Sequence, residues 1–168
     1  MLSNLIQKKR VSDYVLYALI IVSGIGLDQL TKFLTVKFLE VGETSPIIEG
    51  IIHFTHVQNR GAAFGMLADA PWVFNILSTI MILGLSAFLF LGMSPNLWYS
   101  VSIAMIVSGG IGNMIDRLSL RYVVDFIDFR IINFAVFNVA DSIVCIGAGM
   151  MIFALIQDII NEQKQNNL

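Results

Sequence analysis

The stretch IINFAVFNVADSIVCIGAGMMIFALIQ, residues 131–157, is long and apolar enough to cross a lipid bilayer as one helix. Asp141 is its only charged residue. A carboxylate at the centre of a membrane helix costs roughly 2.5–3.5 kcal/mol on insertion scales. Because a partner or a water-filled cavity must offset that cost, an acid in this position predicts a functional site.

The whole chain has the composition of an integral membrane protein. Of its 168 residues, 57% are hydrophobic and 13% are charged, and the mean hydropathy is +0.80. Soluble domains usually carry about 25% charged residues. The net charge of −2 says nothing about partners, but the lack of a basic stripe argues against nucleic acid as a partner. The single cysteine, Cys145, has no companion for a disulfide or a metal site, and we expect no metal and no other cofactor.

Four hydrophobic runs reach the roughly 20 residues that a membrane helix needs. They predict a mainly α-helical membrane protein of one domain, residues 1–168, with four transmembrane helices at about 14–36, 71–92, 97–117 and 131–157. Lys8, Lys9 and Arg10 precede the first run and favour a cytoplasmic N-terminus. Since four spans return the chain to the side where it started, we expect both termini in the cytoplasm.

Two longer connecting segments, residues 37–70 and 118–131, would then face outward. Each contains a run rich in β-branched and aromatic residues, GIIHFTHVQN at 50–59 and YVVDFIDF at 122–129. These runs predict a small extracytoplasmic β-sheet that lies on the outer membrane face. The stretch 40–50 matches no motif, and we assign it no function.

Asp125, in the second of these runs, is a candidate partner for Asp141, and Asn138 is placed one helical turn before Asp141 to orient its carboxylate. Two carboxylates held close together in a low-dielectric site cannot both ionise, so the pair shares a proton. Such a pair can hydrolyse a peptide bond, because one acid takes a proton from water while the other hydrogen-bonds the carbonyl. Asp128 would share a face with Asp125 in a helix and oppose it in a strand, and periodicity does not choose between the two.

Polar residues also interrupt the first run and end the third. Asp28 and Lys32 have the i,i+4 spacing of a helical ion pair, which favours a structural role. The third run ends in SGGIGNMIDR, where the glycines allow another helix or backbone to approach closely. Asn113 can share a helical face with Asp116 and Arg117, a charge pair that fits either the site or the membrane interface.

Five motifs together resemble those of bacterial lipoprotein signal peptidases (signal peptidase II, prolipoprotein signal peptidases). They are DQLTK at 28–32, NRGAAFG at 59–65, GGIGNMIDR at 109–117, VVDFIDF at 123–129 and FNVADS at 137–142. The resemblance covers essentially the whole chain and implies a hydrolase of the bacterial cytoplasmic (inner) membrane, an aspartic endopeptidase. Such enzymes remove the signal peptide from diacylglyceryl-modified prolipoproteins, cutting just before the lipidated cysteine, and globomycin-type cyclic peptides inhibit them.

The resemblance assigns the catalytic dyad to Asp125 and Asp141, and it alone prefers Asp125 to Asp128. The positions that it places in or around the substrate pocket, as binding or supporting residues, are Asn59, Gly61, Asn113, Arg117, Asn138, Asp28, Lys32 and Asp116. It implies water attack activated by the two acids, a lipidated prolipoprotein as substrate, membrane lipid as surroundings and a site near the outer face. Phe54 and the loop at 61–65 would then cover that site and limit the entry of water.

Two other functions remain open on the residues alone. A small proton-coupled transporter or channel subunit could use Asp28 and Asp141 as relay sites. Transporters commonly show inverted repeats, however, and the two halves of this chain show no such similarity. A structural membrane subunit without activity is the third alternative, and it leaves Asp125, Asp141 and their asparagines unexplained.

Overall fold

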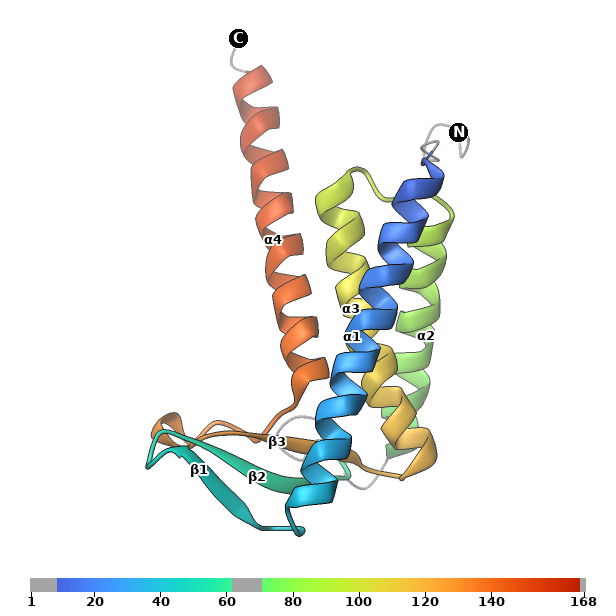
Figure 1. Cartoon of the computed structure of the whole chain (residues 1–168). Coiled ribbons are helices and arrows are strands. Elements are labelled where there is room, and N and C mark those ends of the chain that lie inside the picture. The colour runs from blue at the N-terminus through green and yellow to red at the C-terminus, as the bar shows by residue number, and fades with distance from the viewer. Residues whose placement is uncertain (1–8, 62–70, 167–168) are drawn as a thin grey trace.

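The computed structural model describes residues 9–61 and 71–166. Within these ranges the chain forms four α-helices, one short 3-10 helix and three strands, with the helices side by side and the sheet across one end (Figure 1). In chain order the elements are α1 (Val11–Phe38), β1 (Thr44–Ile48), β2 (Ile52–Asn59), α2 (Pro71–Phe90), α3 (Leu97–Ser119), β3 (Val123–Phe129), η3 (Arg130–Ile132) and α4 (Val139–Asn166). The start of α1 and the end of α4 both lie away from the sheet (Figure 1).

Three of the described helices are long and apolar enough to cross a membrane: α1, α3 and α4. The apolar stretch of α2, Asn75–Phe90, is shorter. Large apolar side chains such as Leu19, Val22 and Leu83 are more than 60% exposed on the helices, as expected of a surface that lipid covers. The prediction of a mainly helical membrane protein with a small sheet is confirmed, and the count of four spans stays a prediction.

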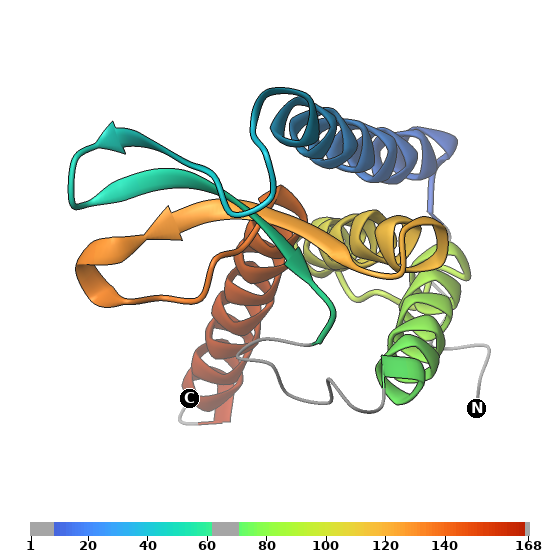
Figure 2. The same cartoon turned by 90° about the horizontal axis from the view of Figure 1, so that it is seen from below.

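The central helix is α3, which packs against α1, α2 and α4 (Figure 2). Its buried residues Ile103, Ala104 and Val107 form one apolar cluster with Tyr17 of α1 and Leu89 of α2. This cluster holds three helices together at the end away from the sheet.

Near the sheet, the backbones of α3 and α4 are in direct contact. A Cβ atom at Gly109 of α3 would collide with the carbonyl oxygen of Ala140, at the start of α4. Glycine at this position therefore lets the first turn of α4 lie directly against α3, as the glycine-rich motif predicts.

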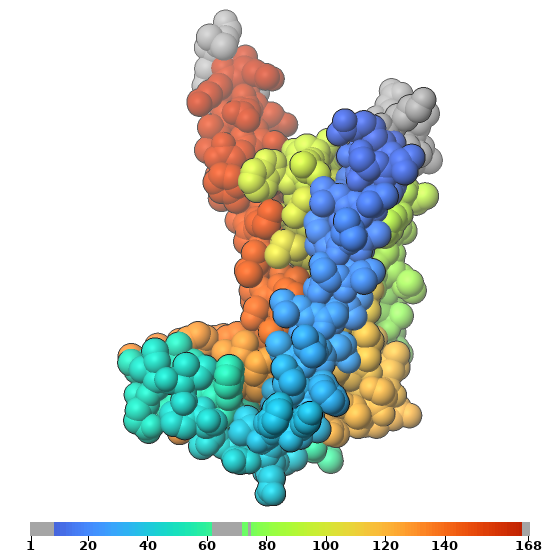
Figure 3. Space-filling view, viewed as in Figure 1, coloured from blue at the N-terminus to red at the C-terminus, as the bar shows by residue number. Residues whose placement is uncertain are grey.

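The sheet is antiparallel in the order β1-β2-β3 and projects to one side of the helices (Figure 3). In the pairing of β2 with β3, Val57 lies opposite Asp125 and Asn59 lies opposite Val123. The strands expected within 50–59 and 122–129 are present. Strand β1 was not expected. Its five residues are all exposed and show no alternation of apolar and polar residues, and Pro46 lies within it. Proline fits there because β1 is an edge strand.

The fourth apolar run is not α-helical from residue 131, where the chain forms the 3-10 helix η3. The predicted start of the last α-helix is wrong by eight residues (Ile131 against Val139). Phe137 instead forms a β-bridge with Ile127, and both backbone N–H groups of this bridge donate to the other residue's carbonyl. That pairing holds Phe137 beside β3, and residues 130–132 form the 3-10 helix η3, so the α-helix begins only at Val139. Asp141 is therefore the third residue of the helix rather than a residue near its middle.

Candidate active site

The bridge between Ile127 and Phe137 brings β3 to the start of α4, and with it two acids from different elements. Asn138 lies between them: its Nδ2 donates to Asp125 Oδ1 at 2.7 Å, and its backbone N–H donates to Asp141 Oδ2 at 3.2 Å. Asp125 and Asp141 are thus held by the same residue, at the junction of the sheet and the helices.

Asn138 also begins helix α4. Its Oδ1 accepts a hydrogen bond from the backbone N–H of Asp141 at 2.9 Å, so the two residues bond each other reciprocally. This is the arrangement of a capping box, which satisfies N–H groups that a helix start otherwise leaves unpaired. A negative charge in the first turn of a helix is favoured by the helix dipole, and Asp141 occupies that position.

Asp125 is 2% exposed and lies on the same strand as Asp128, with very different surroundings. Asn59, at the end of β2, donates through Nδ2 to Asp125 Oδ2 at 2.8 Å, and its own Oδ1 accepts from the N–H of Gly61. Burial raises the pKa of the Asp125 carboxyl to about 6. Hydrogen bonds from Asn59 and Asn138 act against this rise in pKa, whereas the charge of Asp141 adds to it.

Asp128 is three residues further along and lies on the other face of the strand, as alternation requires. It accepts from Thr55 Oγ1 at 2.7 Å and pairs with Arg130 at 3.0 Å. Burial acts to raise the pKa of Asp128, but these hydrogen bonds outweigh it and hold the pKa below its usual value. The strand thus places Asp125, and not Asp128, beside Asn138.

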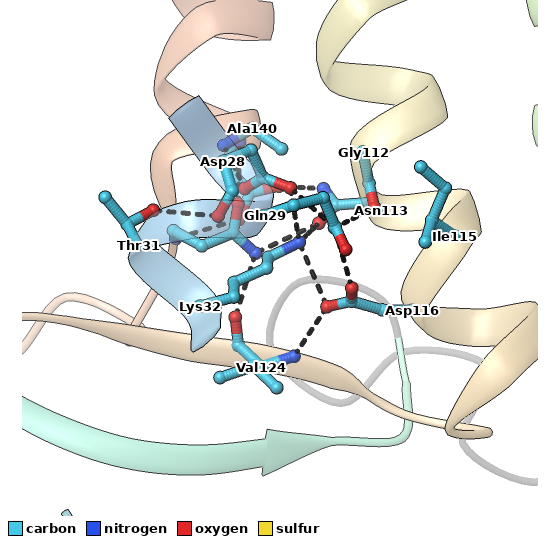
Figure 4. A network of polar contacts seen from close by, with 12 residues as sticks. Asp28, Gln29, Thr31, Lys32, Gly112, Asn113, Ile115, Asp116, Val124 and Ala140 are labelled. Atoms are coloured by element: carbon cyan, nitrogen blue, oxygen red, sulfur yellow. Dashed lines mark hydrogen bonds and ion pairs between the residues drawn. The ribbon is translucent and has the colours of Figure 1, made fainter. Parts of the chain in front are cut away.

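A buried ionic cluster around Lys32 (Figure 4) is linked to Asp141 through Asn113. Lys32 of α1 pairs with Asp28 at 2.9 Å, as their spacing predicts, and with Asp116 of α3 at 3.0 Å. Its ammonium also donates to Asn113 Oδ1 at 2.9 Å, and Asn113 Nδ2 donates to Asp141 Oδ1 at 2.8 Å. Hydrogen bonds between side chains therefore connect α1 through α3 to α4.

The same cluster holds the backbone beside each acid. Asp28 Oδ1 accepts from the N–H of Ala140 at 2.9 Å, and Asp116 Oδ2 accepts from the N–H of Val124 at 3.1 Å. Ala140 precedes Asp141 and Val124 precedes Asp125 in the chain. Asp28 and Asp116 therefore hold the backbone one residue before Asp141 and Asp125.

Gln29 belongs to this cluster and was not singled out from the sequence. Its Nε2 lies 3.2 Å from Asp28 Oδ2, 3.2 Å from the carbonyl of Gly112 and 3.0 Å from Asp116 Oδ1. The available signal was its position in DQLTK, because a residue three before Lys32 on a helix lies on the same side.

The remaining predicted residues lie around the two acids. The guanidinium of Arg117 interacts electrostatically with Asp141, Asp125 and Asp116. Phe54, 41% exposed, packs edge-on against Phe126 at 5.9 Å between ring centroids. Residues 62–65 of the loop expected to cover the site lie outside the described residues. Among the described residues, no group of three or more His, Cys, Asp or Glu side chains could hold a metal ion.

Residues 20–157 match the family model described as signal peptidase (SPase) II. The chain belongs to the signal peptidase II family. Lipoprotein signal peptidases of Streptococcus pyogenes serotypes M5 (strain Manfredo) and M3 (strain SSI-1) are 41% and 40% identical to it over 142 residues, which cover 83% of this chain and 92% of each relative.

Solved structures agree with this family membership. A bacterial membrane enzyme determined by the in meso method at 2.3 Å resolution has a TM-score of 0.79 and 34% identity, covering 86% of this chain and 90% of that one. A second, at 1.9 Å, has a TM-score of 0.75 and 34% identity, with coverage of 84% and 93%. This signal peptidase II family member is an aspartic peptidase and a multi-pass bacterial membrane protein. The transporter and the inactive structural subunit are thereby set aside.

Proposed function

We propose that this enzyme removes the signal peptide from diacylglyceryl-modified prolipoproteins and cuts just before the lipidated cysteine. The observation that carries the proposal is the pair formed by Asp125 and Asp141 around Asn138. The curated relatives are named lipoprotein signal peptidases, which supports this choice of substrate.

In the proposed reaction Asp141 is ionised and Asp125 carries the proton. Asp141 lies at a helix start and accepts N–H bonds from Asn113 and Asn138, which suits an anion. Asp125 lies on a strand, fully buried, and burial favours its neutral form.

The proton transfers balance with these two acids alone. Asp141 takes a proton from a water molecule while the water oxygen attacks the scissile carbonyl carbon. Asp125 donates its proton to the carbonyl oxygen, which forms a neutral gem-diol. As the C–N bond breaks, Asp141 protonates the leaving amine and the diol returns a proton to Asp125, so the starting state is restored.

The proposed topology has four spans, both termini in the cytoplasm and the active site near the outer face. Helix α2 serves as the fourth span, because its 20 uncharged residues extend about 30 Å. Asp125 lies on β3 and Asp141 in the first turn of α4, and this end of the helices is opposite to both described ends of the chain (Figure 1). A lipid-modified precursor stays in the bilayer, so its cleavage site approaches sideways at this depth. Globomycin-type cyclic peptides would compete for the same site.

The test is cleavage of one purified precursor with and without the diacylglyceryl group. The detergent-purified enzyme is expected to cut the lipidated precursor and to release a product whose mass begins at the modified cysteine. The unlipidated precursor, with the same sequence, is the matched control and is expected to stay intact. Equal cleavage of both precursors, or a cut elsewhere in the chain, would contradict the proposed substrate.

A further inference from the structure

Lys32 makes more contacts than an ordinary helical ion pair. Its side chain is 4% exposed, and its Nζ lies 2.9 Å from Asp28 Oδ2, 3.0 Å from Asp116 Oδ2 and 2.9 Å from Asn113 Oδ1. A lysine ammonium has three N–H donors and no acceptor. The three contacts therefore use every donor, two on carboxylates and one on an amide (Figure 4).

The contact with Lys32 determines which way the Asn113 amide points. Because the ammonium can only donate, the atom facing it must be the amide oxygen. The amide nitrogen then points to the opposite side, where it donates to Asp141 Oδ1 at 2.8 Å. If the amide were reversed, two donors would face each other at Lys32, and two acceptors would face each other at Asp141.

Asn138 gives weaker support to the same orientation. Its Nδ2 also donates to Asn113 Oδ1, at 3.0 Å. This amide NH2 group also donates, however, to Asp125 Oδ1 at 2.7 Å and to the carbonyl of Val124 at 3.4 Å. Its hydrogen bonds are shared among three oxygens, whereas Lys32 directs one charged donor to Asn113. Charge-assisted hydrogen bonds are roughly twice as strong as neutral ones.

We propose that Lys32 is a positioning residue of the peptidase: it orients the Asn113 amide so that Asp141 keeps an N–H donor and remains the ionised, proton-accepting member of the dyad. This inference rests on the proposed reaction, in which Asp141 is the base. Other charged groups around Asp141 are Asp125 on β3 and Arg117 on α3. Lys32 differs from Arg117 because it acts through a neutral amide whose two ends have opposite hydrogen-bonding character.

The variant that removes the ammonium is Lys32→Met, which keeps a long apolar side chain. Loss of an outer group that orients a metal ligand typically lowers activity about 10–100-fold, and we take the same range for a group that orients the dyad. We expect kcat of Lys32→Met to fall by about that factor with KM nearly unchanged, since Lys32 contacts the dyad's support rather than the substrate. The matched control is Lys37→Met. Lys37 lies on the same helix, is exposed and is placed over the rings of Phe33 and Phe38, and we expect this variant to keep the wild-type kcat.

A second variant, Asn113→Asp, separates orientation from folding. It keeps an oxygen acceptor for Lys32, but it places a second carboxylate oxygen where Nδ2 donated to Asp141, so Asp141 loses this donor and faces another acid. The protein is expected to fold and to lose kcat as Lys32→Met does. Wild-type kcat in a folded sample of either variant would overturn the proposal. If Lys32→Met does not fold, Asn113→Asp decides.

The protonation pattern gives a readout that does not need cleavage. At pH 5, below the pKa of about 6 for Asp125, infrared spectra should show a protonated-carboxyl C=O band that Asp125→Asn removes and Asp141→Asn leaves intact. In the Lys32→Met background, Asp141→Asn should remove part of this band, because some of the proton has moved to Asp141. A band that Asp141→Asn leaves intact in both backgrounds would refute the role of Lys32. An enzyme that cuts no lipidated precursor would instead refute the proposed function alone.

Discussion

Asp125 is deeply buried and accepts two hydrogen bonds, so the stability of the folded state depends on whether its carboxyl is protonated. Its pKa rises from 3.8 to about 6 on folding, mainly because of burial. A carboxyl whose folded pKa is raised contributes stability below its unfolded pKa and loses that stability as the pH rises through the folded pKa. The affected window is therefore about pH 4–6.

We predict that the wild-type protein in detergent becomes less stable as the pH rises from 4 to 7. Two pKa units correspond to about 2–3 kcal/mol of unfolding free energy from Asp125. Thermal unfolding of Asp125→Asn should lack this part of the slope. Asp128→Asn is the control and should retain it, because Asp128 has a lowered pKa and the opposite sign of pH dependence. Parallel pH profiles of wild type and Asp125→Asn would contradict the assignment.

Asn138 has two separable roles, as the cap of α4 and as the donor to Asp125. Loss of an asparagine cap costs about 1 kcal/mol. We predict that Asn138→Ala lowers both thermal stability and kcat. Asn96→Ala, which removes the side-chain cap of α3, should lower stability by a similar amount and leave kcat unchanged. Equal effects of the two variants on kcat would show that Asn138 acts only as a cap.

At the scale of elements, the contact between α3 and α4 depends on a glycine. A Cβ at Gly109 would collide with the carbonyl of Ala140 and lie 2.7 Å from Val144 Cγ2. We predict that Gly109→Ala destabilises the protein by about 1–3 kcal/mol and lowers kcat, because the first turn of α4 carries Asp141. Gly149→Ala, on α4 at a position where an added Cβ has no atom within 4 Å, should be neutral or slightly stabilising. Tm and kcat of both variants measure this, and a harmless Gly109→Ala would contradict the close contact.

Apolar runs of spanning length predicted the helices well, since length and hydropathy are local properties of the chain. Local patterns failed where pairing partners are distant. Strand β1 has no buried face, so nothing in Thr44–Ile48 marks it. Residues 131–137 are mostly apolar like the helix that follows, and the 3-10 helix η3 and the bridge from Phe137 to Ile127 keep them out of that helix.

At the scale of the whole molecule, the motifs named the candidate site residues but not the hydrogen bonds that connect them. The spacing of Asp28 and Lys32 predicted their ion pair, which is a local feature. The bond from Lys32 to Asn113 spans 81 residues and that from Asn113 to Asp141 spans 28, so neither could be predicted from spacing. The sequence offered no physical reason to prefer Asp125 to Asp128. The structure supplies one, because β3 is a strand and the two acids lie on its opposite faces.

The proposed topology makes a prediction for intact cells. In a Cys145→Ser background, Glu49→Cys in the exposed turn between β1 and β2 should react with a membrane-impermeant thiol reagent added outside. Lys164→Cys, near the end of α4, is the matched control and should react only after the membrane is opened, since basic residues favour the cytoplasmic side. The reverse labelling pattern would place the sheet in the cytoplasm and contradict the topology.

The most direct test of the account is the turnover of a lipidated prolipoprotein by Asp125→Asn and Asp141→Asn, with Asp128→Asn as the matched control on the same strand. Removing a general acid or base lowers the rate about 100-fold or more, so both dyad variants should lose at least that factor. Asp128→Asn should cleave at the wild-type rate. Full activity of either dyad variant, in a folded sample, would contradict the claim that these two acids share one proton and activate water.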